Sequence, residues 1–523
     1  SRGLGDVYKR QVFVLLSLLG MMAALIADKM RPGMVLFSVV VLFLCVGILT
    51  PKEMLEGFSN KGMITVALLF LVSEGIRQSG TLGQVIKKLL PQGKTTVFKA
   101  QLRILPSVAF ISAFLNNTPV VVIFAPIIKH WAKSVKLPAT KFLIPLSYVT
   151  ILGGICTLIG TSTNLVVHGM ILEAGYEGFT MFELGKVGIF IAIAGIIYLF
   201  IFSKRLLPDA RPDTAVPDEE VEEGEKLHRV EAVLGARFPG INKKLSDFNF
   251  QRHYGAEVKE IKTRNGQRYV DHLEDVVLRE GDTLVVMADD TFIPTWGESS
   301  VFVLLTNGND PDTSGKKKRW LALILLVLMI VGATVGELPA TKEMFPDIKL
   351  DMFFFVCITT IIMAWTNIFP ARKYTKYISW DILITIACAF AISKAMVNSG
   401  VADCVAGFII GLSDDYGPHV LLAILFVITN LFTELITNNA AAALAFPLAL
   451  SISAQLGVSP TPFFVVICMA ASASFSTPIG YQTNLIVQGI GNYKFTDFVR
   501  IGLPLNIITF LISVILIPLI WNF

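Results

Sequence analysis

Long runs of apolar residues fill most of this chain, and they form two sets on either side of a polar middle. The first set covers about 12–29, 33–50, 62–79, 98–135, 140–172 and 183–204, and the second covers about 320–337, 350–369, 380–398, 417–455, 460–489 and 498–521. A helix needs about 20 residues to cross the ~30 Å hydrocarbon core of a bilayer. The pattern therefore predicts an all-α polytopic membrane protein with six hydrophobic segments in each half.

Two of these segments, 98–135 and 417–455, are too long for one span and carry amide and hydroxyl residues at their midpoints. The first contains I-S-A-F-L-N-N-T-P from Ile111, and the second contains T-E-L-I-T-N-N-A from Thr433. An unsatisfied amide in hydrocarbon costs roughly 2–7 kcal/mol. Helix-breaking residues at that depth occur where the backbone is buried in protein or lines a wet cavity. We therefore predict a re-entrant helical hairpin in each segment.

The two halves repeat one another. The motif G-x-x-T-N-L starts at Gly160 and again at Gly480, 320 positions later, and the pair at Ser79 recurs at Ser399. Five crossings and one hairpin per half are an odd number, so the second copy is expected to be inverted. Matched polar breaks in inverted repeats point to the binding site of a transporter.

The polar middle separates the repeats and is a different kind of sequence. Four short alternating runs, separated by glycine turns, predict strands and hairpins of a small α+β insert: H-R-V-E-A-V-L, A-E-V-K-E-I-K, D-T-L-V-V-M-A and V-F-V-L-L. The expected units are a non-native or truncated N-terminus (1–11), a first repeat (12–205), an acidic Pro-rich linker (206–226), the insert (227–305), a basic linker (306–319) and a second repeat (320–523).

Composition supports a membrane protein. Only 16% of the 523 residues are charged, against about 25% in soluble domains, and a net charge of +4 gives no indication of a nucleic-acid partner. Lys and Arg collect in cytoplasmic loops, and a cytoplasmic insert places the basic loops inside and the C-terminus outside. We expect a multi-pass protein of the cell inner membrane. No Ser/His/Asp constellation or P-loop is present, so an enzyme or an ATP-driven pump has no support.

The hairpin tips offer suitable chemistry for ions at mid-membrane. Helix N-termini carry about half a positive charge and favour anions, whereas unwound carbonyls favour cations. The alternative is that Asn and Thr only join helices. The segments 140–172 and 460–489 are also broken, each by its G-x-x-T-N-L motif, and the recurrence of four polar breaks in two matched pairs favours a site. Glu434 is an intramembrane acid that suits proton coupling or a polar partner, and its counterpart Ala113 is apolar.

The paired trios resemble the Ser-Asn-Thr motifs of the divalent anion:sodium symporters, in the ion transporter superfamily, over about 30–205 and 320–523. The resemblance implies Na⁺ as the coupling ion, no organic cofactor, and a homodimer in the lipid bilayer. It implies one sodium site at Ser112, Asn116, Asn117 and the backbone of Gly160, and a second at Thr433, Thr437, Asn438 and the backbone of Ile436 and Gly480. It places the anion against Asn117, Thr118, Asn438 and Asn439, with Thr161 and Tyr481 nearby.

This chain departs from that pattern at several of these positions. Asn116 and Thr437 stand where the family has Ser, and Asn439 stands where it has Thr. The insert is similar to the TrkA-C type (RCK C-terminal) regulatory module, which implies a possible small ligand, and carriers with such an insert resemble sulfate transporters.

The sequence therefore predicts a secondary active transporter that couples Na⁺ to uptake of a small inorganic or organic divalent anion, sulfate or dicarboxylate, with regulation by the insert. Two alternatives remain open, namely a cation/proton antiporter or arsenite-type carrier on the same scaffold, and a membrane sensor.

Overall fold

Helices dominate the computed structural model of this chain. It describes residues 2–27, 29–91, 93–209, 228–235, 237–263, 267–289, 292–296, 301–306, 316–411 and 417–523. Within these ranges, eight stretches of helix are long and apolar enough to cross a membrane. The prediction of a helical, multi-pass membrane protein is confirmed at this level.

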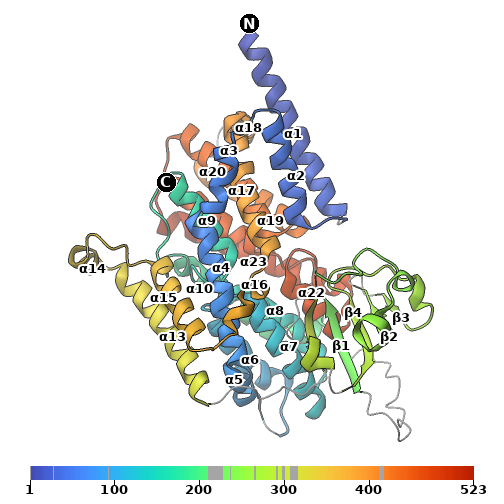
Figure 1. Ribbon diagram of the computed structural model, residues 1–523. Coiled ribbons are helices and arrows are strands. Elements are labelled where there is room, and N and C mark those ends of the chain that lie inside the picture. The colour runs from blue at the N-terminus through green and yellow to red at the C-terminus, as the bar shows by residue number, and fades with distance from the viewer. Residues whose placement is uncertain are drawn as a thin grey trace, which may run out of the picture.

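Each half contains a similar succession of helices. Before the insert lie α1 (Arg2–Ala27), α2 (Pro32–Cys45), α3 (Pro51–Glu56), α4 (Lys61–Gln78), α5 (Thr81–Leu89), α6 (Val97–Ser112), α7 (Asn117–Ser134), α8 (Leu143–Gly154), α9 (Ser162–Glu173) and α10 (Gly185–Leu206). After it lie α13 (Lys316–Gly336), α14 (Pro339–Met344), α15 (Met352–Trp365), α16 (Tyr374–Tyr377), α17 (Trp380–Asn398), α18 (Val401–Gly411), α19 (Gly417–Leu435), α20 (Asn438–Leu456), α21 (Thr461–Ser472), α22 (Gln482–Gly491) and α23 (Phe495–Ile520). Because α1 starts at Arg2, most of the first 11 residues are helical, and they project beyond the other helices (Figure 1).

The two long polar segments are broken where the sequence pattern predicts. Asn116 separates α6 from α7 in an extended conformation (φ −55°, ψ 140°), and Thr437 separates α19 from α20 (φ −70°, ψ 148°). Two further breaks, 155–161 and 473–481, separate α8 from α9 and α21 from α22. Each break ends one helix and starts the next, so that four helices begin inside the bundle.

The insert forms a five-stranded antiparallel sheet in the order β3-β2-β4-β1-β5. Its elements are β1 (His228–Leu234), α11 (Phe250–Tyr254), β2 (Glu257–Lys262), β3 (Arg268–Tyr269), β4 (Thr283–Ala288), α12 (Phe292–Trp296) and β5 (Phe302–Thr306). The predicted alternating runs are β1, β2, β4 and β5. The sheet packs on a separate aromatic core around Phe238, and it lies across the molecule from α13 and α15 (Figure 1).

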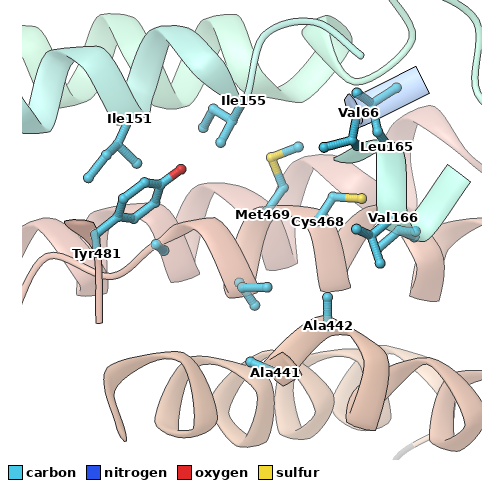
Figure 2. Close-up of a cluster of buried hydrophobic side chains, with 14 of the residues drawn as sticks. Val66, Ile151, Ile155, Leu165, Val166, Ala441, Ala442, Cys468, Met469 and Tyr481 are labelled. Atoms are coloured by element: carbon cyan, nitrogen blue, oxygen red, sulfur yellow. The ribbon is translucent and has the colours of Figure 1, made fainter. Parts of the chain in front are cut away.

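Small and flexible apolar side chains bring the inner helices close together. Figure 2 shows Met469 and Cys468 of α21 between Ile155, directly after α8, and Ala442 of α20. All four are buried in one continuous hydrophobic core. Burial of such side chains in dense contact supplies the main attraction between the helices. Tyr481, which enters the same layer, brings a hydroxyl to its edge (Figure 2).

Candidate functional site

At the first hairpin tip, the Asn117 side chain is part of a hydrogen-bond network. Its amide lies 2.9 Å from the Ser112 hydroxyl and 2.6 Å from the Tyr481 hydroxyl. In the amide orientation that satisfies both ends, its nitrogen donates to the carbonyls of Thr150 (3.0 Å) and Gly160 (3.2 Å), and its oxygen accepts from Tyr481. A buried amide must find such partners, so the tip and the following loop are held together by one side chain.

The second hairpin tip repeats this arrangement. The Thr433 hydroxyl oxygen lies 2.7 Å from the Asn438 amide and 2.6 Å from the carbonyl oxygen of Ala471, both within hydrogen-bond distance. As with Ser112 and Asn117, the hydroxyl belongs to the last turns of one helix and the amide opens the next, five residues later. Both hydroxyl residues are fully buried. The two tips therefore share one local geometry, although their sequences differ in most other positions.

The two loops that follow the hairpins also correspond contact by contact. Asn164 donates to the carbonyl of Thr157 at 2.9 Å, and Asn484 donates to the carbonyl of Thr477 at 3.2 Å. Each of these Thr side chains in turn donates to a backbone carbonyl in the adjacent hairpin tip. These two Asn belong to the G-x-x-T-N-L repeat, but the sequence did not indicate that they fasten the loop to the tip.

Tyr481 joins the two halves at the centre of the site. Its hydroxyl contacts Asn117 and lies 3.1 Å from the Thr161 hydroxyl, and it also interacts with the Asn438 side chain. Tyr481 is 9% exposed and Thr161 is 2% exposed. A single phenol therefore lies among residues from both hairpin tips and from one loop, where the family resemblance placed the anion.

Four helices begin next to one another around this phenol. At the starts of α7 and α22, Thr118 donates to Gln482 Oε1 at 3.3 Å. At the starts of α9 and α20, Ser162 and Thr163 donate to Asn439 Oδ1, both at 3.3 Å. Helix N-termini carry unsatisfied N–H groups and about half a positive charge each. The paired starts therefore favour a negatively charged ligand without an ionised side chain.

The remaining residues that were predicted to hold Na⁺ lie at the same breaks. The side chains of Asn116 and Thr437 make no capping hydrogen bond, and the buried Thr437 hydroxyl has no partner within the described residues. Asn116 lines a cavity of about 10 Å³ together with Ser162, which is about the space that one water molecule needs. Ile436 is 5% exposed. Gly480 packs directly on the backbone of Thr433, because a Cβ at Gly480 would lie 2.5 Å from the carbonyl oxygen of Thr433. Two residues that were predicted as ligands of the second sodium site are therefore in close contact.

One polar network beside the second tip was not predicted. Glu434 Oε1 accepts from the backbone N–H of Ser476 at 2.9 Å and from Asn506 Nδ2 at 2.8 Å. Its Oε2 and the Asn506 oxygen are both buried and lack a hydrogen-bond partner in the described part of the chain. Asn506 lies on α23, far from the motifs, and one amide in an apolar helix gave no signal of this contact.

Comparison with known proteins identifies the family. The model of the citrate transporter family matches residues 22–452 and 344–523. The chain belongs to this family.

Individual relatives agree with that assignment. An uncharacterised transporter of Synechocystis is 30% identical over 92% of this chain and 93% of its own length. A putative sulfur deprivation response regulator of Chlamydomonas reinhardtii is 28% identical over 92% and 96% of the two chains. A probable sodium/sulfate cotransporter of the same alga is 32% identical over 54% of this chain and 31% of its own length. The protein is therefore a transporter of the family that includes citrate, sulfate and dicarboxylate carriers.

Proposed function

We propose that this citrate-family transporter is a secondary carrier that couples Na⁺ to the movement of a small divalent anion, sulfate or a dicarboxylate. The observation that carries the proposal is the convergence of two tip asparagines and four helix starts on Tyr481. Within the described residues, the hydrogen bonds of this cluster involve amides, hydroxyls and carbonyls only. These groups donate to an oxyanion and offer oxygen ligands to Na⁺.

The coupling follows from charge compensation. A divalent anion in a low-dielectric bundle needs more positive charge than helix ends supply. Na⁺ held by Ser112, Asn116 and Asn117 at one tip, and by Thr433, Thr437 and Asn438 at the other, provides it next to the anion. Binding of each ion then lowers the cost of binding the other, which is the reciprocal linkage that a symporter needs.

The topology that we propose for this site is two inverted repeats around one midplane cavity, with the insert in the cytoplasm and the C-terminus outside. The hairpin-bearing helices of each protomer move against the framework of a homodimer and expose the site to one side at a time. The insert is a TrkA-C-like module that regulates this movement.

Uptake by the purified protein in proteoliposomes tests the function. We expect radiolabelled sulfate or succinate to accumulate only with an inward sodium gradient, and citrate serves as the third substrate. Uptake that is equal in sodium-containing and sodium-free (choline) buffer would contradict sodium coupling. If none of the three anions accumulates under any gradient, the protein is not a divalent anion carrier.

A cation/proton antiporter on the same scaffold is the second candidate, because Glu434 is a carboxylate without a cationic partner in the described residues. Glu434→Gln keeps the shape and both accepted hydrogen bonds but removes the ionisable group. If protons are coupled through this residue, the variant loses the dependence of flux on a pH gradient. For the sodium-coupled symporter we expect sodium-driven uptake in the variant to keep the pH dependence of the wild type.

A membrane sensor is the alternative of another class, and it is favoured by the relative described as a sulfur deprivation response regulator. Measurable solute flux by the purified protein would exclude a purely sensory role.

A further inference from the structure

The sheet of the insert is docked on α7 through a buried ion cluster. Lys129 of α7 pairs with Glu231 of β1 at 3.0 Å, and Lys262 of β2 lies 3.5 Å from the same carboxylate. The side chains of Lys129, Glu231 and Lys262 are 23%, 12% and 4% exposed. Burial raises the pKa of Glu231, but the facing lysines outweigh burial and lower the pKa to about 2. The carboxylate therefore stays charged, and the contact persists at physiological pH.

A second contact docks the same sheet on α22. Thr283 of β4 packs against Gly489, where an added Cβ would overlap the Thr283 hydroxyl oxygen and lie 3.5 Å from the Thr283 Cβ. Gly281 packs against Leu485, one turn earlier on the helix. Thr283 is fully buried, and its hydroxyl has no hydrogen-bond partner within the described ranges. Only glycine at position 489 allows the strand to approach this closely.

The two docked helices are those that meet at the candidate site. Lys129 lies 12 residues after Asn117, and Gly489 lies 8 residues after Tyr481, which correspond to about 18 Å and about 12 Å along a helix. At the other end of these helices, Asn117 and Tyr481 are in direct contact at 2.6 Å. The insert therefore contacts both α7 and α22, the two helices whose starts meet at the candidate site (Figure 1).

We propose that the insert is an intramolecular brake, which joins α7 to α22 and slows the separation of Asn117 from Tyr481 that admits the anion. The inference rests on the proposed function for the identity of the anion. The restraint itself acts on the two helices whatever solute they admit. A change that loosens either contact shifts the population toward the open site, and a change that tightens one shifts it toward the closed site.

A disulfide between β4 and α22 tests whether tightening this contact slows uptake. The Cβ separation of 3.5 Å between positions 283 and 489 falls in the range of about 3.5–4.5 Å found in disulfides. We expect oxidised Thr283→Cys/Gly489→Cys protein, made without the exposed Cys45 and Cys404, to take up anion about fivefold more slowly than the same protein after reduction. The two single-cysteine variants serve as controls and should not respond to oxidation.

A larger side chain at position 489 tests whether loosening the contact between β4 and α22 speeds uptake. Gly489→Ala places a methyl group against the Thr283 hydroxyl, and we expect uptake about fivefold faster than in the wild type. Adding Thr283→Ala removes the hydroxyl, leaves a Cβ contact of ordinary length, and should restore the slow rate. Gly407→Ala is the matched control, because a Cβ at this helical glycine meets only Gln455 Oε1, at 3.7 Å.

Hydrogen exchange at the starts of α7 and α22 separates this proposal from the proposed function. We expect faster exchange there in Gly489→Ala and slower exchange in the oxidised double-cysteine protein. Exchange and uptake that do not change in either protein would overturn the brake. A wild-type protein that transports none of the three anions, but whose exchange responds in this way, would reject the proposed function and retain the brake.

Discussion

Asn117 and Asn438 have the same local arrangement, although they lie in different halves of the chain. In each case the amide group lies within hydrogen-bond distance of a buried hydroxyl five residues earlier, so each amide is oriented by the helix that precedes it. An amide held in this way can contact a ligand through its oxygen with little further loss of side-chain entropy at the moment of binding. This preorganisation is the reason to expect that both residues are needed, and not only one.

Replacing either asparagine tests this expectation. Asn117→Ala and Asn438→Ala should each reduce sodium-coupled uptake to background, because each removes a ligand and leaves buried carbonyl or hydroxyl groups unpaired, at about 1–3 kcal/mol per group. Asn398→Ala is the control, since this amide also makes two hydrogen bonds, to Ile48 and Glu53, at the end of α17. Full uptake in a folded Asn117 or Asn438 variant, measured in proteoliposomes, would disprove the site.

The positions of the helix breaks could be predicted from the sequence. Amide and hydroxyl residues are expensive in hydrocarbon, and the observed helices α7 and α20 begin at Asn117 and Asn438, inside the two polar trios. Four of the five strands of the insert were also predicted, because alternating apolar and polar residues between glycine turns are typical of strands, whereas the two-residue β3 was not. Both predictions rest on local patterns of apolar and polar residues, which a single sequence shows directly.

The pairing between elements could not be predicted in this way. Tyr481 and Asn117 are 364 positions apart, and their contact depends on how the whole bundle packs. The resemblance to a known family implied that Tyr481 lies near the anion, whereas Asn506 and its contact with Glu434 had no sequence signal at all. Gly160 and Gly480 were visible in the sequence as part of a repeat. Which atoms they pack against depends on the three-dimensional arrangement of the helix ends.

Gly154, the last residue of α8, is also in close contact with the first hairpin tip. A Cβ there would lie 2.6 Å from the nearer end of the Asn117 amide group and 3.1 Å from the carbonyl oxygen of Gly160. We therefore expect Gly154→Ala to displace the Asn117 amide and to lower sodium-coupled uptake at least about tenfold, with the affinity for Na⁺ falling as well. Gly407→Ala changes a helical glycine that has room for a methyl group, and it should transport normally. Wild-type sodium affinity in the Gly154 variant would show that the loop does not position Asn117.

At the scale of the whole molecule, one polar insert connects two helices from different halves. The sequence shows the insert as a separate unit with its own strands, and the separate core around Phe238 agrees with that view. It did not show that Lys129 and Gly489 are its docking points, because each is unremarkable within its own helix. A lysine near the end of a helix normally faces solvent, and a helical glycine normally only weakens the helix.

Deletion of residues 215–305 tests whether the insert is needed to hold the site together or only slows its opening. The helices α7 and α22 pack directly against each other, and Asn117 contacts Tyr481 without help from the sheet, so the site should form without the insert. Because the brake is removed, we expect the deletion protein to take up anion at least as fast as Gly489→Ala, with unchanged sodium dependence. A monodisperse deletion protein that folds but transports nothing would mean that the sheet is needed to hold α7 and α22 in place, since the deletion leaves every residue of the site itself unchanged.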